Sequence, residues 1–159
     1  MKARVQCQTI NTVQQRETRL METKEELVAK LEMERPTKCP HCGDHVSYVN
    51  NEKIYGRPYG RWPFAYRCDS FTCDSYVGVH PNTEKALGTL ANRPMREARK
   101  EHKPKFFALL EKKGWGRNKG YKWLAEAMGL PRQKTHWGMF DVEQCELAGR
   151  LCVEAMNNE

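Results

Sequence analysis

Residues 38–80 read KCPHCGDHVSYVNNEKIYGRPYGRWPFAYRCDSFTCDSYVGVH and contain two close pairs of cysteines. Cys39 and Cys42 form a C-P-x-C-G turn, and Cys68 and Cys73 follow a tyrosine-rich segment. A tetrahedral zinc site takes four thiolates, and each short pair bends the backbone so that both sulfurs reach the metal. The spacing therefore predicts a zinc ribbon, a β-hairpin with one structural Zn²⁺ held by these four cysteines.

The second cysteine pair encloses four residues, where many zinc ribbons have two. This wider spacing leaves other ligands open, because His41, His45 and His80 lie nearby in the sequence. Four cysteines remain the simplest ligand set. We expect His41 to point to solvent and His80 to make structural hydrogen bonds at the end of a strand.

Aromatic residues alternate along the returning strand of the predicted hairpin. Trp62, Phe64 and Tyr66 are spaced two apart and in phase with Cys68, so they share the face that carries the metal ligand. The conservative interpretation is that these rings cover the zinc and form a small core. In the alternative interpretation they stack on unpaired bases, and nearby arginines contact phosphates: Arg57, Arg61 and Arg67.

The composition indicates a charged protein with a small hydrophobic core. The 159 residues are 39% hydrophobic and 30% charged, with room for one ordinary domain or two small ones. No apolar run approaches the roughly 20 residues that span a bilayer, and residues 1–10 lack the apolar centre of a signal peptide. We therefore expect a cytoplasmic protein whose seven cysteines are metal ligands or core residues.

The net charge of +7 comes from one stretch. Residues 93–122 hold eleven Lys or Arg against three Glu, whereas residues 1–34 and 43–92 are each neutral. A concentrated basic block is typical of proteins that bind a polyanion, most often nucleic acid, although it can also be a solvated helix face. The candidate nucleic-acid contacts are Arg93, Arg96, Arg99, Lys100, Lys103, Arg117, Lys119 and Lys122, with Arg61 and Arg67 from the ribbon.

Local signals divide this basic stretch. Asn92 can cap a helix that begins near Pro94, and Pro104 should break or restart that helix. Core residues then continue to Gly114. Residues 114–123, GWGRNKGYKW, combine glycine, aromatic and basic residues, which favours a loop that contacts nucleic acid.

Three further helices are expected. Residues 11–34 contain no Gly or Pro and carry alternating charges, which predicts an N-terminal helix ended by Pro36, with a possible weak homodimer through it. A short helix is expected over residues 121–128. Asp141, with Gln144 three residues later, predicts a capped last helix whose buried stripe includes Cys145 and Cys152 as core residues.

Several motifs resemble a known family. The CPHCG turn, the C-x₄-C pair and residues 74–102, DSYVGVHPNTEKALGTLANRPMREARKEH, are similar to a phage-associated and bacterial zinc-finger-containing domain of unknown function. Residues 121–130, YKWLAEAMGL, and 136–145, HWGMFDVEQC, extend the resemblance, which covers about residues 39–152. It implies one zinc ion on Cys39, Cys42, Cys68 and Cys73, a phage or prophage origin and an intracellular setting, and no established reaction.

These observations predict an α+β fold: an N-terminal helix (1–35), a zinc ribbon (36–92) and a basic helical region (93–159) packed beside it. An enzyme is not expected, because no phosphate loop or nucleophile motif is present and a four-cysteine zinc site has no open position. The favoured hypothesis is nucleic-acid binding, with DNA preferred over RNA. The alternative is a small phage protein that docks on a host polymerase, nuclease or defence complex.

Overall fold

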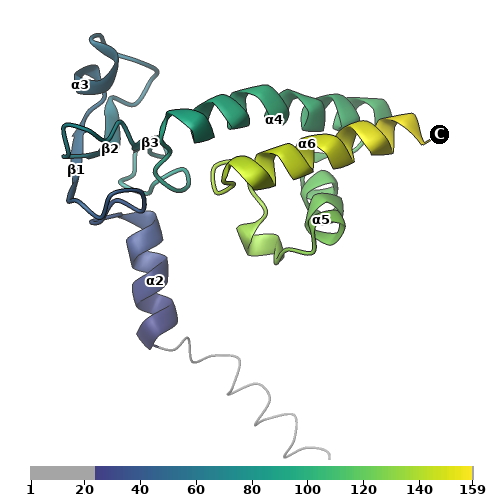
Figure 1. Ribbon diagram of the computed structural model, residues 1–159, viewed down its shortest axis with the longest axis horizontal. Helices are drawn as coiled ribbons and strands as arrows, with labels where there is room; N and C mark the ends of the chain where they lie inside the picture. The colour runs from purple at the N-terminus through teal and green to yellow at the C-terminus, as the bar shows by residue number, and fades with distance from the viewer. Residues whose placement is uncertain (1–23, 159) are drawn as a thin grey trace, which may run out of the picture. The chain divides into compact units, whose positions relative to one another are not determined.

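The computed structural model describes residues 24–158 and groups the chain into two units, residues 1–32 and 33–159. Most of helix α2, Lys24–Glu34, lies in the first unit (Figure 1). The helix ends shortly before Pro36, as the sequence predicts. The part of the predicted helix before Lys24, and Cys7, lie outside the described residues.

The second unit begins with a small antiparallel sheet of three strands in the order β1-β2-β3. The strands are β1 Val46–Asn50, β2 Phe64–Cys68 and β3 Tyr76–Gly78. Val46 pairs with Cys68 at one end of the hairpin, and Asn50 pairs with Phe64 at the other. The predicted hairpin is therefore formed, and its register brings the two cysteine pairs to the same end.

The connection between β1 and β2 contains regular structure. It begins with a short helix, α3 Glu52–Tyr55, which ends at Gly56 in the left-handed conformation (φ 70°). Positive φ costs glycine little because it has no Cβ. This connection lies at the end of the hairpin opposite to the cysteines.

Helix α4 spans Arg93–Lys113, and Asn92 caps it as predicted, since its side chain accepts a hydrogen bond from the Met95 N–H. Pro104 lies inside α4, so the prediction that it would break the helix is wrong. Proline removes a hydrogen bond to the carbonyl four residues earlier, that of Lys100. Pro104 and Lys100 are both exposed, so water can solvate this carbonyl, while buried residues on the opposite face hold the helix to the core.

The predicted loop 114–123 is a second correction, because helix α5 already begins at Arg117 and runs to Met128. Gly120, which suggests a loop from the sequence, is buried where α5 packs on α4. A Cβ at this position would overlap the Leu110 side chain and press on Phe106. The glycine thus permits close helix packing rather than loop flexibility.

A short 3₁₀ helix, η1 Arg132–Lys134, precedes the last helix, α6 Val142–Asn157. The predicted capping box is present: the Gln144 N–H donates to Asp141 Oδ1, and the Asp141 N–H donates to Gln144 Oε1. Cys145 and Cys152 are fully buried, as expected of core residues. The fold is therefore α+β, with a small sheet followed by a helical region.

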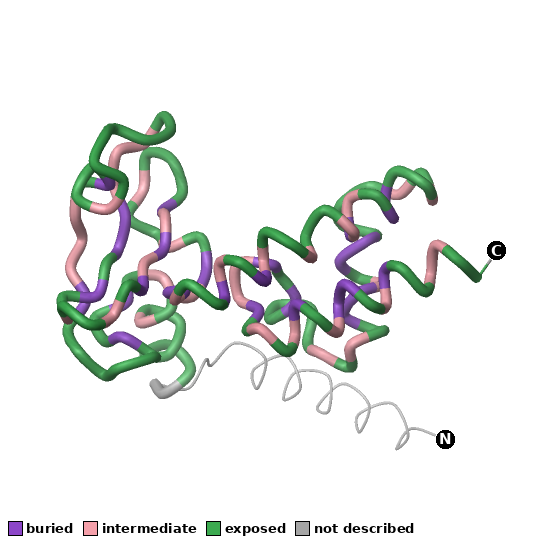
Figure 2. Tube along the Cα trace, turned by 45° about the horizontal axis from the view of Figure 1, so that its top comes forward, coloured by how far each residue is buried: buried purple, intermediate pink, exposed green. Residues whose placement is uncertain are grey.

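Two hydrophobic cores lie within the second unit. The ribbon core includes Val46, Tyr66, Val77, Val79 and Leu90. The helical core lies between α4, α5 and α6 (Figure 2) and contains Phe106, Leu109, Leu124, Trp137, Phe140, Cys145, Ala148 and Cys152. No helix between Lys24 and Asn157 is long and apolar enough to cross a membrane.

The junction between the ribbon and the helices yields a stability prediction. The Thr89 N–H donates to the Gly138 carbonyl oxygen at 2.9 Å, and a Cβ on the preceding Gly88 would overlap that carbonyl group. We expect Gly88→Ala to lower the free energy of unfolding by about 1–3 kcal/mol, because backbone cannot move aside as a side-chain tip can. Thermal or urea unfolding measures the change.

The matched control is Gly116→Ser, because a Cβ on Gly116 meets nothing within 4 Å and serine is a good helix N-cap. The stability of this variant should be unchanged or slightly raised. If the Gly88→Ala protein were as stable as the unsubstituted protein, the close approach of Gly88 to the Gly138 carbonyl would be contradicted.

Candidate metal centre and candidate nucleic-acid interface

The four predicted ligands come from two turns at one end of the hairpin. Cys39 and Cys42 precede β1 in a tight turn, in which the Cys39 N–H donates to the Asp44 carbonyl and the Gly43 N–H donates to the Cys39 carbonyl. Cys68 is the last residue of β2, and Cys73 closes the next turn. Antiparallel pairing thus places sulfurs that are up to 34 residues apart in the sequence at one point.

The distances between the sulfurs fit a tetrahedral zinc ion. The Sγ atoms of Cys42 and Cys68 lie 3.4 Å apart, those of Cys39 and Cys73 lie 3.7 Å apart, and all four lie within 4.8 Å of one another. Zinc–sulfur bonds of about 2.3 Å in a tetrahedron require sulfurs about 3.8 Å apart. All four are free thiols rather than disulfides. The donor set therefore fits one structural zinc ion.

The environment of the thiols explains why a cation is needed. Burial raises the pKa of the Cys68 thiol. Burial also opposes ionisation of Cys73, but hydrogen bonding with the buried Ser75 and the adjacent thiols brings the pKa of Cys73 down to about 7. Four thiolates at this spacing repel one another, so a divalent ion stabilises the ionised set.

The three histidines that the sequence left open as ligands have other surroundings. The His41 Nε2 hydrogen-bonds to the Leu90 carbonyl at 3.0 Å, so this exposed ring also contacts protein. The His45 Nδ1 lies 2.7 Å from the Asp69 carboxylate. The His80 backbone forms a turn with Thr83 and Lys85. Within residues 24–158, the group of side chains placed to hold a metal consists of the four cysteines alone.

The aromatic residues in and next to β1 and β2 pack within the ribbon. Tyr48 contacts the rings of Phe64 and Tyr66 at centroid distances of 5.0 and 5.1 Å. The Trp62 indole N–H donates to the Thr83 carbonyl, and the Tyr66 hydroxyl donates to that of Glu84. These contacts agree with the interpretation of the rings as a core, because ring faces and polar tips both have internal partners.

Two of the predicted phosphate contacts, Arg96 and Arg99, make structural bonds. Arg96 pairs with the Asp74 carboxylate at 2.6 Å and lies over the Tyr76 ring, and its hydrogen bond and charge lower the pKa of Asp74. Arg99 donates to the Phe140 carbonyl at 2.9 Å and to the Thr89 hydroxyl at 3.0 Å. Both guanidinium groups join α4 to neighbouring segments, and substituting them would disturb the fold.

The other predicted contacts on the helices lie at the surface. Arg93 pairs with Glu97 at 2.8 Å, and both side chains are well exposed. The Lys119 ammonium lies 5.0 Å from the centre of the Trp115 ring. The remaining predicted residues on α4 and α5 are exposed and make none of the ion pairs found among the described residues: Lys100, Lys103, Arg117 and Lys122.

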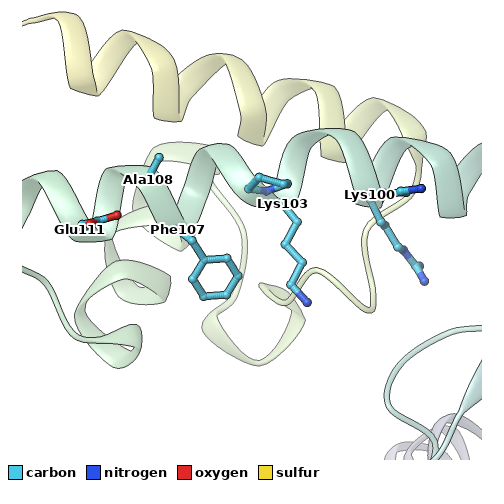
Figure 3. Close-up of a pocket in the computed structure, with 7 residues that line it drawn as sticks. Lys100, Lys103, Phe107, Ala108 and Glu111 are labelled. Carbon is cyan, nitrogen blue, oxygen red and sulfur yellow. The ribbon is translucent and has the colours of Figure 1, made fainter. Parts of the chain in front are cut away.

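A half-buried phenylalanine links two of these cations. Lys103 and Phe107 project side by side from α4 (Figure 3), with the ammonium 5.8 Å from the ring centre. The Arg117 guanidinium of α5 approaches the same ring at 5.4 Å. Lys100, Lys103 and Phe107 line an open groove along α4, whose acidic member, Glu111, pairs with neither lysine. This surface is basic with one aromatic ring at its centre.

Two residues that the sequence reading missed extend this surface. The Arg132 guanidinium lies 5.1 Å from the centre of the Tyr121 ring, and His136 stacks on the same ring at 5.6 Å. Partial burial and the charges of Lys103 and other neighbouring cations lower the pKa of His136. Its Nδ1 accepts a hydrogen bond from the Gly138 N–H, which places the proton of the neutral ring on Nε2.

We call this group the basic face: Lys100, Lys103, Phe107, Arg117, Arg132 and His136. The short run of Arg132, Lys134 and His136 in the sequence was a signal for the missed part. Residues 123–159 have a net negative charge, so a count of charge along the chain does not single out Arg132 and His136. Such a count does not report which side chains share a surface.

A comparison with protein-family models matches residues 35–155 to a zinc-finger-containing domain, and the chain belongs to this family. The match includes the four cysteines and all helices from α4 to nearly the end of α6. No curated protein and no solved structure matches the chain.

The metal centre yields a prediction for zinc content and stability. The Cys68→Ser protein should no longer bind its one zinc ion per chain, and its ribbon should unfold. Metal binding supplies free energy of folding in such small cores. A chelator should do the same to the unsubstituted protein. Metal analysis gives the zinc content, and near-ultraviolet circular dichroism follows the packing of the ribbon aromatics.

The control is Cys152→Ala, which removes a buried thiol of the helical core and should retain one zinc per chain. His41→Ala should retain it too. Full zinc occupancy in the Cys68→Ser protein would rule out the four-cysteine site.

Proposed function

We propose that this zinc-finger-containing protein binds nucleic acid, DNA in preference to RNA, through the basic face. The zinc ribbon serves as a scaffold that positions α4, and the cations of α4, α5 and η1 contact phosphates. The supporting observation is a set of cations that converge around shared aromatic rings and form no ion pair with an acidic side chain in the described part of the chain. Lys103 and Arg117 flank Phe107, and Arg132 lies over Tyr121.

Electrostatics favours an anionic ligand at this surface. Like charges held close together repel one another, and after partial burial, the main cause, the charges of Lys103 and Arg132 also lower the pKa of His136. A chain of phosphates would relieve the repulsion and release its own counterions on binding. A polyanion therefore gains more from this surface than a single small anion does.

The side-chain chemistry suits contacts to a nucleic-acid backbone. Lysine ammonium groups reach phosphate oxygens as flexible point charges, and an arginine can bind two oxygens at once. The neutral His136 has an Nε2–H to donate to a further oxygen. Such contacts position a strand but carry little sequence information, so binding should depend more on salt than on sequence.

A second candidate function is docking on a host protein complex, in keeping with the phage-type origin expected from the sequence. The observation that favours it is a set of exposed apolar side chains on α2: Leu27, Val28, Leu31 and Met33. Exposed leucines on a helix are typical of a surface that contacts another protein or a second copy of the chain. This role could coexist with nucleic-acid binding.

Neutralising the basic face tests the main proposal. We expect Lys103→Gln to weaken DNA binding several-fold, and the combined Lys100→Gln, Lys103→Gln and Arg117→Gln protein to weaken it far more. The slope of log affinity against log salt should fall by about 0.9 for each lost phosphate contact on duplex DNA. Fluorescence anisotropy at several salt concentrations measures both quantities.

Arg150→Gln is the matched control, because Arg150 is an exposed cation of α6 outside the basic face. It should leave the affinity and the slope nearly unchanged. Equal losses from Lys103→Gln and Arg150→Gln would mean that net charge alone drives binding. Absence of binding by the unsubstituted protein at low salt would refute the proposal.

The apolar residues of α2 yield a separate prediction. Leu27→Gln combined with Leu31→Gln should abolish any self-association or capture of host proteins, because both side chains would otherwise be buried in the contact. Sedimentation and affinity capture from host lysate measure these effects, and the same variant should bind DNA normally. Unchanged association would exclude α2 as the contact.

A further inference from the structure

Two tyrosines are exposed at the end of the ribbon that lies opposite to the zinc site. Tyr55 ends α3 and Tyr59 lies in the following loop, and the two residues are 40% and 56% exposed. Their rings contact each other at a centroid distance of 4.6 Å. Burying large aromatic rings is a major source of stability, so an exposed pair in contact is a candidate binding surface.

The loop that carries Tyr59 is held by a buried asparagine. The Asn51 side-chain amide donates to the carbonyl oxygens of Tyr59 at 2.6 Å and Trp62 at 3.3 Å, and its Oδ1 accepts from the Tyr59 N–H. Asn51 is only 4% exposed. Because these bonds order the loop before any ligand arrives, presenting the Tyr59 ring costs little conformational entropy on binding.

Cations surround the tyrosine pair. Arg61 lines a hollow of about 370 Å³ together with both tyrosines, and Arg57 is exposed in the same loop. On the other side of Tyr55, Lys53 and Arg67 line a second hollow. The acidic residue of that hollow, Asp74, is neutralised by Arg96. Burial and hydrogen bonding raise the pKa of Tyr55 to about 12, so its hydroxyl adds no negative charge.

The hollows connect the tyrosine pair to the basic face. Tyr55 contacts the edge of Tyr76 at 5.7 Å, and Arg96 covers that ring. Tyr76 and Arg96 also line a third hollow, whose far side is formed by Lys103 and His136. An extended strand that leaves the basic face can therefore follow these hollows to the tyrosine pair without crossing an unpaired acidic group among their lining residues.

We propose that Tyr55 and Tyr59 stack on an unpaired base, so that the protein prefers single-stranded DNA to duplex DNA. Ring-on-base stacking needs a base face that is free, and in a duplex the neighbouring base pairs cover both faces. The flanking arginines would hold the phosphates next to the stacked base. This inference rests on the proposed function, because the basic face supplies most of the electrostatic attraction, and it adds strand-type selectivity.

The test compares a fluorescein-labelled 15-nucleotide oligothymidine with a 15-base-pair duplex, using the zinc-loaded full chain and fluorescence anisotropy. We expect the single strand to bind at least tenfold more tightly than the duplex. Tyr59→Ala, alone and with Tyr55→Ala, should weaken single-strand binding by about 5- to 150-fold, the range for losing one stacked base. Duplex binding should change less than twofold.

Two controls separate stacking from loss of structure. Tyr59→Phe keeps the ring and should bind the single strand like the unsubstituted protein. Phe71→Ala removes a fully exposed ring from the zinc end of the ribbon and should also leave binding unchanged. Zinc content shows whether each variant keeps its metal site, and thermal unfolding shows whether the rest of the chain is folded. A strand containing 2-aminopurine should show a fluorescence change on binding that Tyr59→Ala abolishes.

The outcomes distinguish the two proposals. Equal affinity for single strand and duplex, with loss on Lys103→Gln and none on Tyr59→Ala, would overturn the stacking inference and leave the basic face intact. No binding of either DNA by the unsubstituted protein would overturn the proposed function and the stacking inference with it. Equal loss from Phe71→Ala and Tyr59→Ala would overturn the assignment of stacking to the tyrosine pair.

Discussion

Four thiolates that must meet at one zinc ion set the geometry of the ribbon. Zinc binding holds the start of β1 next to the end of β2, because the Cys39–Cys42 turn leads into β1 and Cys68 is the last residue of β2. A three-stranded sheet with so small a core gains little from burial alone, so the metal supplies much of its cohesion. The position of the loop that carries Tyr59 therefore depends on a ribbon that the zinc site stabilises.

The basic helix α4 divides its cations between two tasks. Arg96 and Arg99 turn toward carbonyl, hydroxyl and carboxylate oxygens of neighbouring segments, where a planar guanidinium can make several hydrogen bonds at once. Lys100 and Lys103 remain in solvent. A lysine suits that position because its ammonium is strongly hydrated and its stem is flexible. Charge on one helix therefore serves both architecture and a candidate interface.

Aromatic residues divide in the same way within the ribbon. The period-two alternation of β2 puts Phe64 and Tyr66 on one face, where Tyr66 is buried and Phe64 is partly buried against the ribbon core. In the connecting segment after β1, Tyr55 meets only the edge of Tyr76 and the ring of Tyr59, so both tyrosines stay partly exposed. The aromatic residues of β2 therefore fit the core interpretation. The base-stacking interpretation is proposed instead for Tyr55 and Tyr59 in the connecting loop.

The sequence by itself determined the zinc ligands, the hairpin, the caps at Asn92 and Asp141 and the α+β class, because each follows from the spacing of a few neighbouring residues. Tertiary structure decided what local signals misrepresent. Pro104 stays inside α4 because packing outweighs one lost hydrogen bond. Gly120 lies within α5, and it has no side chain there because the Leu110 side chain of α4 occupies that space. The grouping of Lys103 with His136 also required the fold, since side chains far apart in the chain share a surface only after the helices pack.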